Sequence, residues 1–412
     1  MRLCPTVSRR TFIARGAGVV AGASLWAPRL MAAAPRLRVT SLELLPVRAT
    51  PRTVWLIVRL GTDAGVTGLG EASDAFGFAN TTKADAARME TELRAFFGLI
   101  EGQSPFEIGA FRLRGEPLAV KGGLVAATAF SAIEQALWDL AGKALDVPTY
   151  TLLGGRLRQQ LQVYANVNRA TSPRTPAGFA ASAQAAVREG FRAVKAAPFD
   201  GFPAPGSPAA SMDAAVEQGI ACVAAMREAI GPDVELMIDC HSFFDVPLAV
   251  RVARRLEPQK LAWYEEPVAP ERIEETREIR RRISQPMAGG EVLFGVSGFA
   301  ALSRDRAVNV IMPDVKHCGG LLELTRIASV AEVSGVAVAP HNPSGPVATA
   351  ASVQVSAVLK NFRLLELQWG EVPWRHDLVT PSERFEHGTI QVPDRPGLGI
   401  ALNEDVVRAH AL

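Results

Sequence analysis

Acidic residues recur at regular intervals in the second half of the chain, each near the end of a short apolar run. Asp239, Glu265 and Glu291 are separated by 26 and then 26 residues. About that many residues make one strand, one helix and two loops, so the spacing predicts a (β/α) barrel with polar side chains at the carboxyl ends of its strands. Three carboxylates that converge on one rim, with no Cys or His among them, form an oxygen-rich site suited to Mg²⁺.

The same spacing continues with Asp314, His341 and Glu366, at steps of 23, 27 and 25 residues. Asp314 and His341 are expected to end adjacent strands, where a carboxylate bonded to one imidazole nitrogen orients the ring and raises its basicity. This pair predicts a general base, and the alternative is two unrelated rim residues. Glu366 would have to be protonated or paired to lie near an anionic substrate.

Two further side chains are expected at the same rim. Lys195 ends a predicted strand, where it could hold a substrate carboxylate and stabilise negative charge that develops on it. The alternative is a surface lysine. Because strand residues alternate faces, Asp239 and His241 are expected to point the same way, although His241 could also be a loop histidine after the strand. The remaining histidines of the second half are expected to be structural or exposed, and they are His317, His376, His387 and His410.

The elements that position these residues can be placed from periodicity and turn residues. Barrel strands are predicted at 161–166, 191–197, 234–240, 261–266, 287–291, 308–313, 336–341 and 363–367, with helices such as 176–189, 213–230 and 271–282. A hairpin at 54–71 and helices at 81–100 and 126–145 predict an α+β unit before the barrel. A Pro/Gly-rich loop at 198–208 interrupts the regular spacing at the predicted active-site end.

Length and composition set the broad class. The 412 residues allow one large and one smaller domain, and 48% apolar with 21% charged residues is typical of a soluble globular protein. A net charge of +2, from 44 basic and 42 acidic residues, gives no reason to expect nucleic-acid binding. Without the first 34 residues, which hold five arginines and no acid, the balance becomes 39 − 42, or −3.

The N-terminus predicts export. Arg9 and Arg10 precede an apolar, Ala/Gly-rich stretch and three alanines at 32–34, in the order of a twin-arginine signal peptide. The alternative is a disordered basic tail. The apolar stretch is too short and too glycine-rich for a stable span, so residues 1–34 predict a periplasmic protein with no membrane span after signal removal, although Pro35 makes the cleavage position uncertain. Of the four cysteines, Cys4 lies in this segment, and Cys222, Cys240 and Cys318 are too few and too scattered for a disulfide framework.

Several motifs follow one another along the chain: Ala136-Leu-Trp-Asp-Leu-Ala-Gly-Lys143 with Leu152-Leu-Gly-Gly155, Glu265-Glu-Pro267, Gly289-Gly-Glu291, Pro313-Asp314 with Gly319-Gly320, and Ala339-Pro-His341. In combination and in this order, they resemble the mandelate racemase/muconate lactonizing enzyme family of the enolase superfamily. The resemblance covers about residues 38–403. It implies an α/β fold with an N-terminal α+β capping domain at 36–155, a modified (β/α)₇β barrel at 156–373, and a C-terminal segment at 374–412 that returns to the capping domain.

The resemblance also assigns roles. It makes Asp239, Glu265 and Glu291 the Mg²⁺ ligands, Asp314 and His341 the catalytic dyad, and Glu366 the acid of the eighth strand. One departure matters, since racemases of this family carry Lys-x-Lys on the second strand and this chain has Lys195-Ala-Ala197. Asp239-Cys-His241 is instead similar to the Asp-x-His of the family's sugar-acid dehydratases, such as galactonate dehydratase.

The resulting hypothesis is an Mg²⁺-dependent acid-sugar dehydratase that forms a 2-keto-3-deoxy sugar acid. His341 would be the base, assisted by Lys195, and His241 would protonate the departing hydroxyl. The alternatives are a sugar-lactone cycloisomerase or an epimerase, and, from another class, an exported sugar-acid binding protein without catalysis. The expected partner is a small sugar acid or lactone whose identity the sequence does not fix, and the resemblance implies an even-numbered homo-oligomer.

Overall fold

Eight parallel strands close into a barrel in this protein, whose computed structural model describes residues 35–77, 80–204 and 206–412. The strands follow one another in chain order, and the last pairs with the first in parallel through Glu366 and Tyr164. A bridge between Val338 and Phe362 joins the remaining two neighbours. The strands are β4 (Gln160–Asn166), β5 (Ala193–Ala196), β6 (Glu235–Asp239), β7 (Trp263–Glu265), β8 (Met287–Gly289), β9 (Val310–Ile311), β10 (Ala337–Val338) and β11 (Leu365–Gln368).

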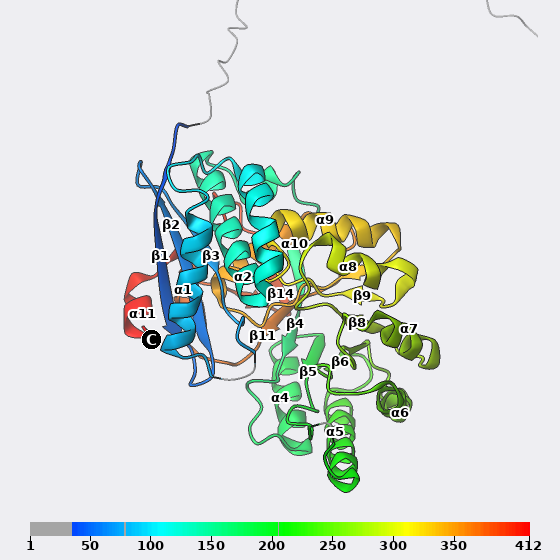
Figure 1. Cartoon of the computed structure of the whole chain (residues 1–412). Helices are drawn as coiled ribbons and strands as arrows, with labels where there is room; N and C mark the ends of the chain where they lie inside the picture. Colours follow the sequence, from blue (N-terminus) through cyan, green and yellow to red (C-terminus); the bar gives the residue numbers. More distant parts are fainter. Residues whose placement is uncertain (1–34, 78–79, 205) are drawn as a thin grey trace, which may run out of the picture. The chain divides into compact units, whose positions relative to one another are not determined.

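Helices connect successive strands and lie outside them (Figure 1). They are α4 (Pro176–Arg188), α5 (Ala209–Ile230), α6 (Val246–Leu256), α7 (Ile273–Arg282), α8 (Gly295–Ser303), α9 (Gly320–Val333) and α10 (Pro346–Ser356). With one helix after each strand from β4 to β10 and none between β11 and the tail, the order is that of a (β/α)₇β barrel. Each predicted barrel strand overlaps an observed one, and the predicted α/β fold class is confirmed.

An antiparallel sheet with two long helical segments precedes the barrel. Strands β1 (Val39–Arg48), β2 (Val54–Thr62) and β3 (Thr67–Glu71) pair in order, and α1 (Lys83–Phe97) and α2 (Ile108–Ala144) pack beside them (Figure 1). The prediction for the second helix began 18 residues too late, at 126 rather than 108. Gly123 breaks α2 with a φ of 70°, and Pro117 with several glycines lowers the helix propensity of its first half.

The β3 strand lies directly on the backbone of α2, which explains two of its glycines. A Cβ added at Gly70 would lie 2.1 Å from the carbonyl oxygen of Ala132, and one at Gly68 would lie 2.2 Å from that of Ala136. We therefore expect Gly70→Ala to lower the free energy of unfolding by about 1–3 kcal/mol through overpacking. Gly109→Ala is the control, because Gly109 lies in α2 with no atom within 4 Å of the added Cβ. Equal urea midpoints for the two variants would contradict this account.

Two buried carboxylates join the N-terminal part to the barrel. Glu71 accepts hydrogen bonds from the backbone N–H groups of Gly345 (2.8 Å) and Ala348 (2.9 Å), at the start of α10. Glu134 accepts from those of Leu321 (2.7 Å) and Leu322 (3.0 Å), at the start of α9. A carboxylate at a helix N-terminus satisfies free N–H groups and complements the helix dipole. These contacts fix the end of β3 and helix α2 against the loops that precede α10 and α9.

The C-terminal residues contact both parts. The short elements β12 (Val379–Thr380), β13 (Phe385–Glu386), β14 (Thr389–Gln391), β15 (Ala401–Leu402) and α11 (Glu404–Ala409) follow the barrel. Strand β14 pairs antiparallel with β4, and the backbone N–H of Leu412 donates to Pro46 in β1 at 3.0 Å. Cys222, Cys240 and Cys318 are free and buried. Within the described ranges, no helix has the length and apolarity to cross a bilayer.

Candidate active site

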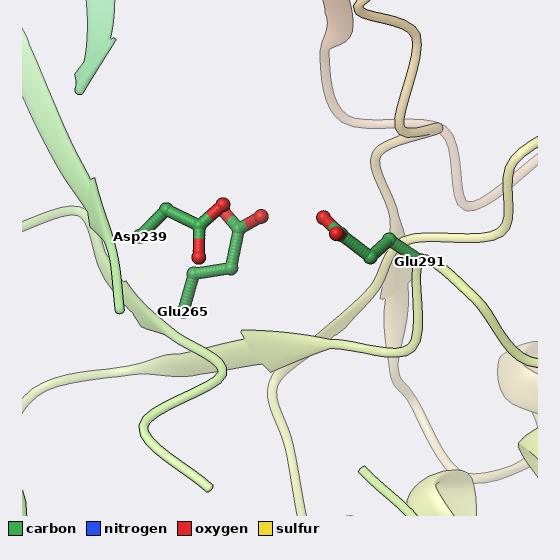
Figure 2. A group of neighbouring side chains, drawn as sticks. All are labelled: Asp239, Glu265 and Glu291. Carbon is green, nitrogen blue, oxygen red and sulfur yellow. The ribbon is translucent and has the colours of Figure 1, made fainter. Parts of the chain in front are cut away.

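Three carboxylates meet at the carboxyl ends of adjacent strands. Asp239 and Glu265 are the last residues of β6 and β7 and are register partners, and Glu291 follows β8. One oxygen from each lies within 4.8 Å of the other two. Figure 2 shows Asp239 and Glu265 side by side with the carboxylate of Glu291 pointing toward them. The parallel register, which places equivalent strand ends at one height, produces this cluster.

The chemistry of the cluster fits a hard divalent cation. Burial, followed by the charge of Asp239, raises the pKa of Glu265 well above its usual range. The Oε2 atom of Glu291 is buried and accepts no hydrogen bond among the described residues. Trp263 donates its Nε1–H to Oε2 of Glu265 at 2.9 Å and so orients that carboxylate. Oxygen ligands crowded together and partly unpaired are those that Mg²⁺ takes in proteins.

Lys195 lies beside the cluster and is not a surface lysine. Its Nζ atom is 2.8 Å from Oε1 of Glu265 and 3.0 Å from Oε1 of Glu366, and the side chain is buried. Glu366 also accepts hydrogen bonds from Asn166 Nδ2 (2.7 Å) and from the backbone N–H of Asn342 (2.9 Å). Burial opposes the charge on Glu366, but Lys195 and His341 outweigh it and lower the pKa to about 2. Of the two states expected for this acid, the structure has the paired one.

Asp314 and His341 form a hydrogen-bonded pair on the neighbouring part of the rim. Both follow short strands, β9 and β10, and His341 Nδ1 lies 2.7 Å from Oδ2 of Asp314. The other ring nitrogen, Nε2, lies 3.2 Å from Oε2 of Glu291, so it faces the carboxylate cluster. Burial alone would lower the pKa of His341, but Glu291 and the bond to Asp314 raise it. This geometry orients one imidazole nitrogen toward the cluster, as a general base requires.

Lys316 is a second partner of Asp314 that the sequence analysis missed. Its Nζ atom lies 2.8 Å from Oδ2 of Asp314 and is fully buried, and it also contacts the hydroxyl of Ser344. Burial would raise the pKa of Asp314, but Lys316 and then His317 lower it far below its usual range. Asp314 is therefore held ionised and acts on His341 as a fixed anion. The position of Lys316, two residues after Asp314, was visible in the sequence, but no spacing rule pointed to it.

His241 reaches the cluster from a loop and not from a strand. Strand β6 ends at Asp239, and His241 has a left-handed backbone with a φ of 42°. The strand-alternation argument for its direction was therefore wrong, yet its Nε2 lies 3.1 Å from Oδ2 of Asp239. Its backbone N–H donates to Oδ1 of the same carboxylate at 2.8 Å, which fixes the turn. Burial opposes the charge on His241, but Asp239 and Asp200 raise its pKa to about 10.

A cavity of about 270 Å³ opens onto this site. Its lining includes Lys195, Asp239, His241, Glu291 and His341. Arg52, in the loop after β1, and Asp74 and Gly77, in the loop after β3, contribute to its lining. None of the described residues in the 198–208 loop lines this cavity. His317 does line it: burial lowers its pKa to about 4, and its Nδ1 lies 2.9 Å from the hydroxyl of Thr128. A wall of polar and charged groups suits a small polyhydroxylated ligand.

An ion-pair network joins the N-terminal loops to the barrel at this wall. Asp74, with a φ of 64°, places Oδ1 3.2 Å from Nη2 of Arg169, and Arg169 Nη1 lies 3.4 Å from Oε1 of Glu371. Arg169 Nη1 also donates to the carbonyl of Pro343 at 3.1 Å. A non-glycine residue in the left-handed region is uncommon and is held there by its surroundings. The loop after β3 is therefore fixed over the cavity by its own side chain.

Comparisons with known proteins agree with this fold. Residues 41–154 match the family model described as mandelate racemase / muconate lactonizing enzyme, N-terminal domain. Residues 178–406 match the model described as enolase C-terminal domain-like. The chain therefore belongs to the mandelate racemase/muconate lactonizing enzyme family of the enolase superfamily, as its motifs predicted.

Curated relatives and solved structures within this family resemble most of the chain. A D-xylonate dehydratase from Haloferax volcanii is 33% identical over 395 residues, which is 91% of this chain and 90% of the relative. A D-galactonate dehydratase from Ralstonia pickettii is 32% identical over 375 residues, 89% of this chain and 92% of the relative. The crystal structure of a mandelate racemase/muconate lactonizing enzyme from Jannaschia sp. CCS1 superposes with a TM-score of 0.81 at 30% identity, covering 91% and 98% of the two chains.

Proposed function

We propose that this protein is an Mg²⁺-dependent acid-sugar dehydratase, which removes a proton next to a carboxylate and eliminates the neighbouring hydroxyl. One observation carries the proposal: two imidazoles flank the carboxylate cluster, with Nε2 of His341 3.2 Å from Glu291 and Nε2 of His241 3.1 Å from Asp239. Elimination needs one group that takes a proton and another that gives one. The positions of the two imidazoles, one beside Glu291 and the other beside Asp239, support this pair of roles.

Asp239, Glu265 and Glu291 are the residues that would hold Mg²⁺. When bound, the ion supplies Lewis-acid stabilisation of negative charge on the substrate carboxylate. Lys195 complements this role, because its ammonium is buried between Glu265 and Glu366 and is fixed before substrate arrives. A preorganised cation in a buried site stabilises developing charge without reorganisation.

The proton transfers follow from the two histidines. His341, oriented by Asp314, takes the α-proton as the Cα–H bond breaks, and the electron pair is delocalised onto the substrate carboxylate. The Cα–Cβ double bond forms as the Cβ–O bond breaks, and the departing hydroxyl takes a proton from His241 and leaves as water. The enol product becomes the 2-keto-3-deoxy acid. Substrate and products balance as one acid sugar giving one keto acid and one water.

The residue at position 197 favours elimination over epimerisation. Racemisation in this family is expected to use a second base at position 197, directly after the second barrel strand, β5. Ala197 is buried and its side chain cannot act as a base. His241 is the remaining candidate for a second base, but its backbone N–H donates to Asp239 and its Nε2 lies 3.1 Å from the same carboxylate. That placement suits protonation of a leaving group beside the carboxylate.

The relatives support an acid sugar as substrate, since the names D-xylonate dehydratase and D-galactonate dehydratase are attached to proteins about one-third identical to this chain. Their substrates differ in length and stereochemistry, so the particular sugar acid follows from the cavity and not from the catalytic groups. The cavity wall, with Arg52, Asp74 and Arg169, offers several hydrogen-bonding groups to the distal hydroxyls.

The proposal is tested with purified protein, Mg²⁺ and a set of aldonates, aldarates and their lactones, by the absorbance of semicarbazones of 2-keto acids. Keto acid from an open-chain acid, lost on EDTA addition and regained with excess Mg²⁺, is the expected result. Signal from lactones alone would replace the dehydratase with the cycloisomerase. No keto acid from any compound would contradict the proposal, and α-proton exchange in D₂O would then separate an epimerase from a binding protein.

We also propose that the protein is exported by the twin-arginine route to the periplasm. The support is the Arg9-Arg10 pair before an apolar stretch, in residues 1–34 that lie outside the described ranges. Replacement of both arginines by lysine should keep a tagged full-length protein in the cytoplasmic fraction, while the unaltered chain fractionates with the periplasm. Equal distribution of the two would contradict export by this route.

A further inference from the structure

His241 has a carboxylate partner of its own that no motif in the sequence indicated. Its Nδ1 lies 2.6 Å from Oδ1 of Asp200, while the opposite ring nitrogen faces Asp239. The arrangement repeats that of His341, whose Nδ1 lies 2.7 Å from Asp314 and whose Nε2 faces Glu291. Each imidazole is thus held at Nδ1 by a carboxylate and presents Nε2 to the cluster.

Asp200 is itself fixed by partners on its second oxygen. Asn168 donates its Nδ2–H to Oδ2 of Asp200 at 2.8 Å, and Nη2 of Arg174 lies 3.4 Å from the same atom. Arg174 also donates to the carbonyl and to the side-chain oxygen of Asn168, both at 3.0 Å. With both oxygens engaged by separate partners, the carboxylate has one orientation, and its Oδ1 atom is directed at the histidine.

The loop that carries Asp200 is anchored to the segment that carries His241. Phe199 and Phe202, on either side of Asp200, pack edge to face on Phe244, with ring centroids 5.1 and 5.2 Å apart. Phe244 follows His241 by three residues. A Cβ at Gly219 of α5 would lie 2.2 Å from the ring of Phe199, so the helix also closes on this anchor. The aromatic residues of this loop therefore set the distance between aspartate and imidazole.

We infer that Asp200 is a positioning residue that acts through His241. Its hydrogen bond keeps the proton on Nδ1 and aims Nε2 at the point where the substrate hydroxyl departs, in the way a carboxylate orients a catalytic imidazole. The inference rests on the proposed dehydratase function, in which His241 protonates the leaving group. It also gives a role to the Pro/Gly-rich 198–208 loop: none of its described residues lines the cavity, and the loop carries the carboxylate that holds His241.

The test separates leaving-group protonation from every other step. Asp200→Asn is compared with the unaltered enzyme on an acid-sugar substrate and on its 3-deoxy-3-fluoro analogue, because fluoride departs without a proton. We expect kcat for the hydroxyl substrate to fall about 10- to 100-fold. Fluoride release, α-proton exchange in D₂O and Mg²⁺ affinity by calorimetry should change less than about threefold, since His341 and the carboxylate cluster are untouched. Asp200→Glu should restore part of the lost kcat.

Asp213→Asn is the control, because Asp213 is an exposed residue of α5 that pairs with Arg251. It should leave both reactions unchanged. An equal fall of hydroxyl and fluoride elimination in Asp200→Asn would show a structural effect and overturn the inference, as would an unaltered kcat. If the unaltered enzyme forms keto acid from no acid sugar, the dehydratase proposal itself fails and takes this inference with it. Fluoride release by the variant shows that it is folded.

Discussion

His341→Asn should lower kcat for keto-acid formation by about 10³-fold or more, which is among the largest effects expected for a single side chain here. Nδ1 of His341 is fixed by Asp314 at 2.7 Å, so Nε2 has one direction, toward the cluster and 3.2 Å from Glu291. Asparagine can keep the bond to Asp314 but cannot accept the α-proton. The exchange of that proton with D₂O, followed by NMR, should disappear together with turnover.

Two comparisons make the His341 result specific. His376→Asn should be neutral, because His376 is more than half exposed and lies in the tail after the barrel. Mg²⁺ affinity measured by calorimetry should be retained in His341→Asn, since the three carboxylates remain. Retained α-proton exchange with lost turnover would assign the base elsewhere and leave His341 a role in a later step.

The barrel could be predicted because most of its strands are short, largely apolar runs that end at or near a polar residue. Parallel strands buried on both faces have this pattern, and Val234 to Asp239 and Leu261 to Glu265 are examples. The regular spacing of the strand ends then placed the carboxylates on one rim before any contact was known. The parallel register then places Asp239 and Glu265 side by side, because they are direct partners on adjacent strands.

The second carboxylate–histidine pair could not be predicted in this way. Asp200 and His241 are 41 residues apart and both lie in loops, where neither strand alternation nor helical periodicity applies. His241 depends on a left-handed turn, a conformation that its residue type does not require. Lys195 and Glu366 were each identified separately, but their 3.0 Å contact depends on barrel closure between the first and last strands.

The N-terminal half of α2 was missed for a different reason. Residues 108–122 contain Pro117 and several glycines, which weaken local helix propensity, and the segment is helical because it packs against the rest of the capping unit. Phe111, for example, stacks on Phe130 in the second half of α2 with ring centroids 4.9 Å apart. The helical conformation of residues 108–122 therefore depends on tertiary packing across the break at Gly123, which local sequence does not indicate.

Glu291→Gln should weaken Mg²⁺ binding by more than about 100-fold. Loss of a residue that only hydrogen-bonds to a metal ligand already lowers metal affinity about 10- to 100-fold, and Glu291 would be a ligand itself. Glu291 contributes one of three clustered oxygens, and its buried Oε2 atom, 3.2 Å from Nε2 of His341, accepts no hydrogen bond among the described residues. Glutamine keeps the shape but removes one of the three negative charges that would hold the ion. Calorimetric titration with Mg²⁺ measures the loss without reference to turnover.

Glu271→Gln is the matched control for Glu291→Gln, since Glu271 lines the same cavity and lies outside the carboxylate cluster. Both substitutions remove one negative charge from the cavity, so a general electrostatic effect would weaken binding in both to a similar degree and would fall with added salt. Direct ligation predicts a large loss in Glu291→Gln alone, persistent at high salt. An unchanged affinity in Glu291→Gln would remove this residue from the ligand set and leave Asp239 and Glu265 without a third carboxylate, which would make the Mg²⁺ assignment untenable.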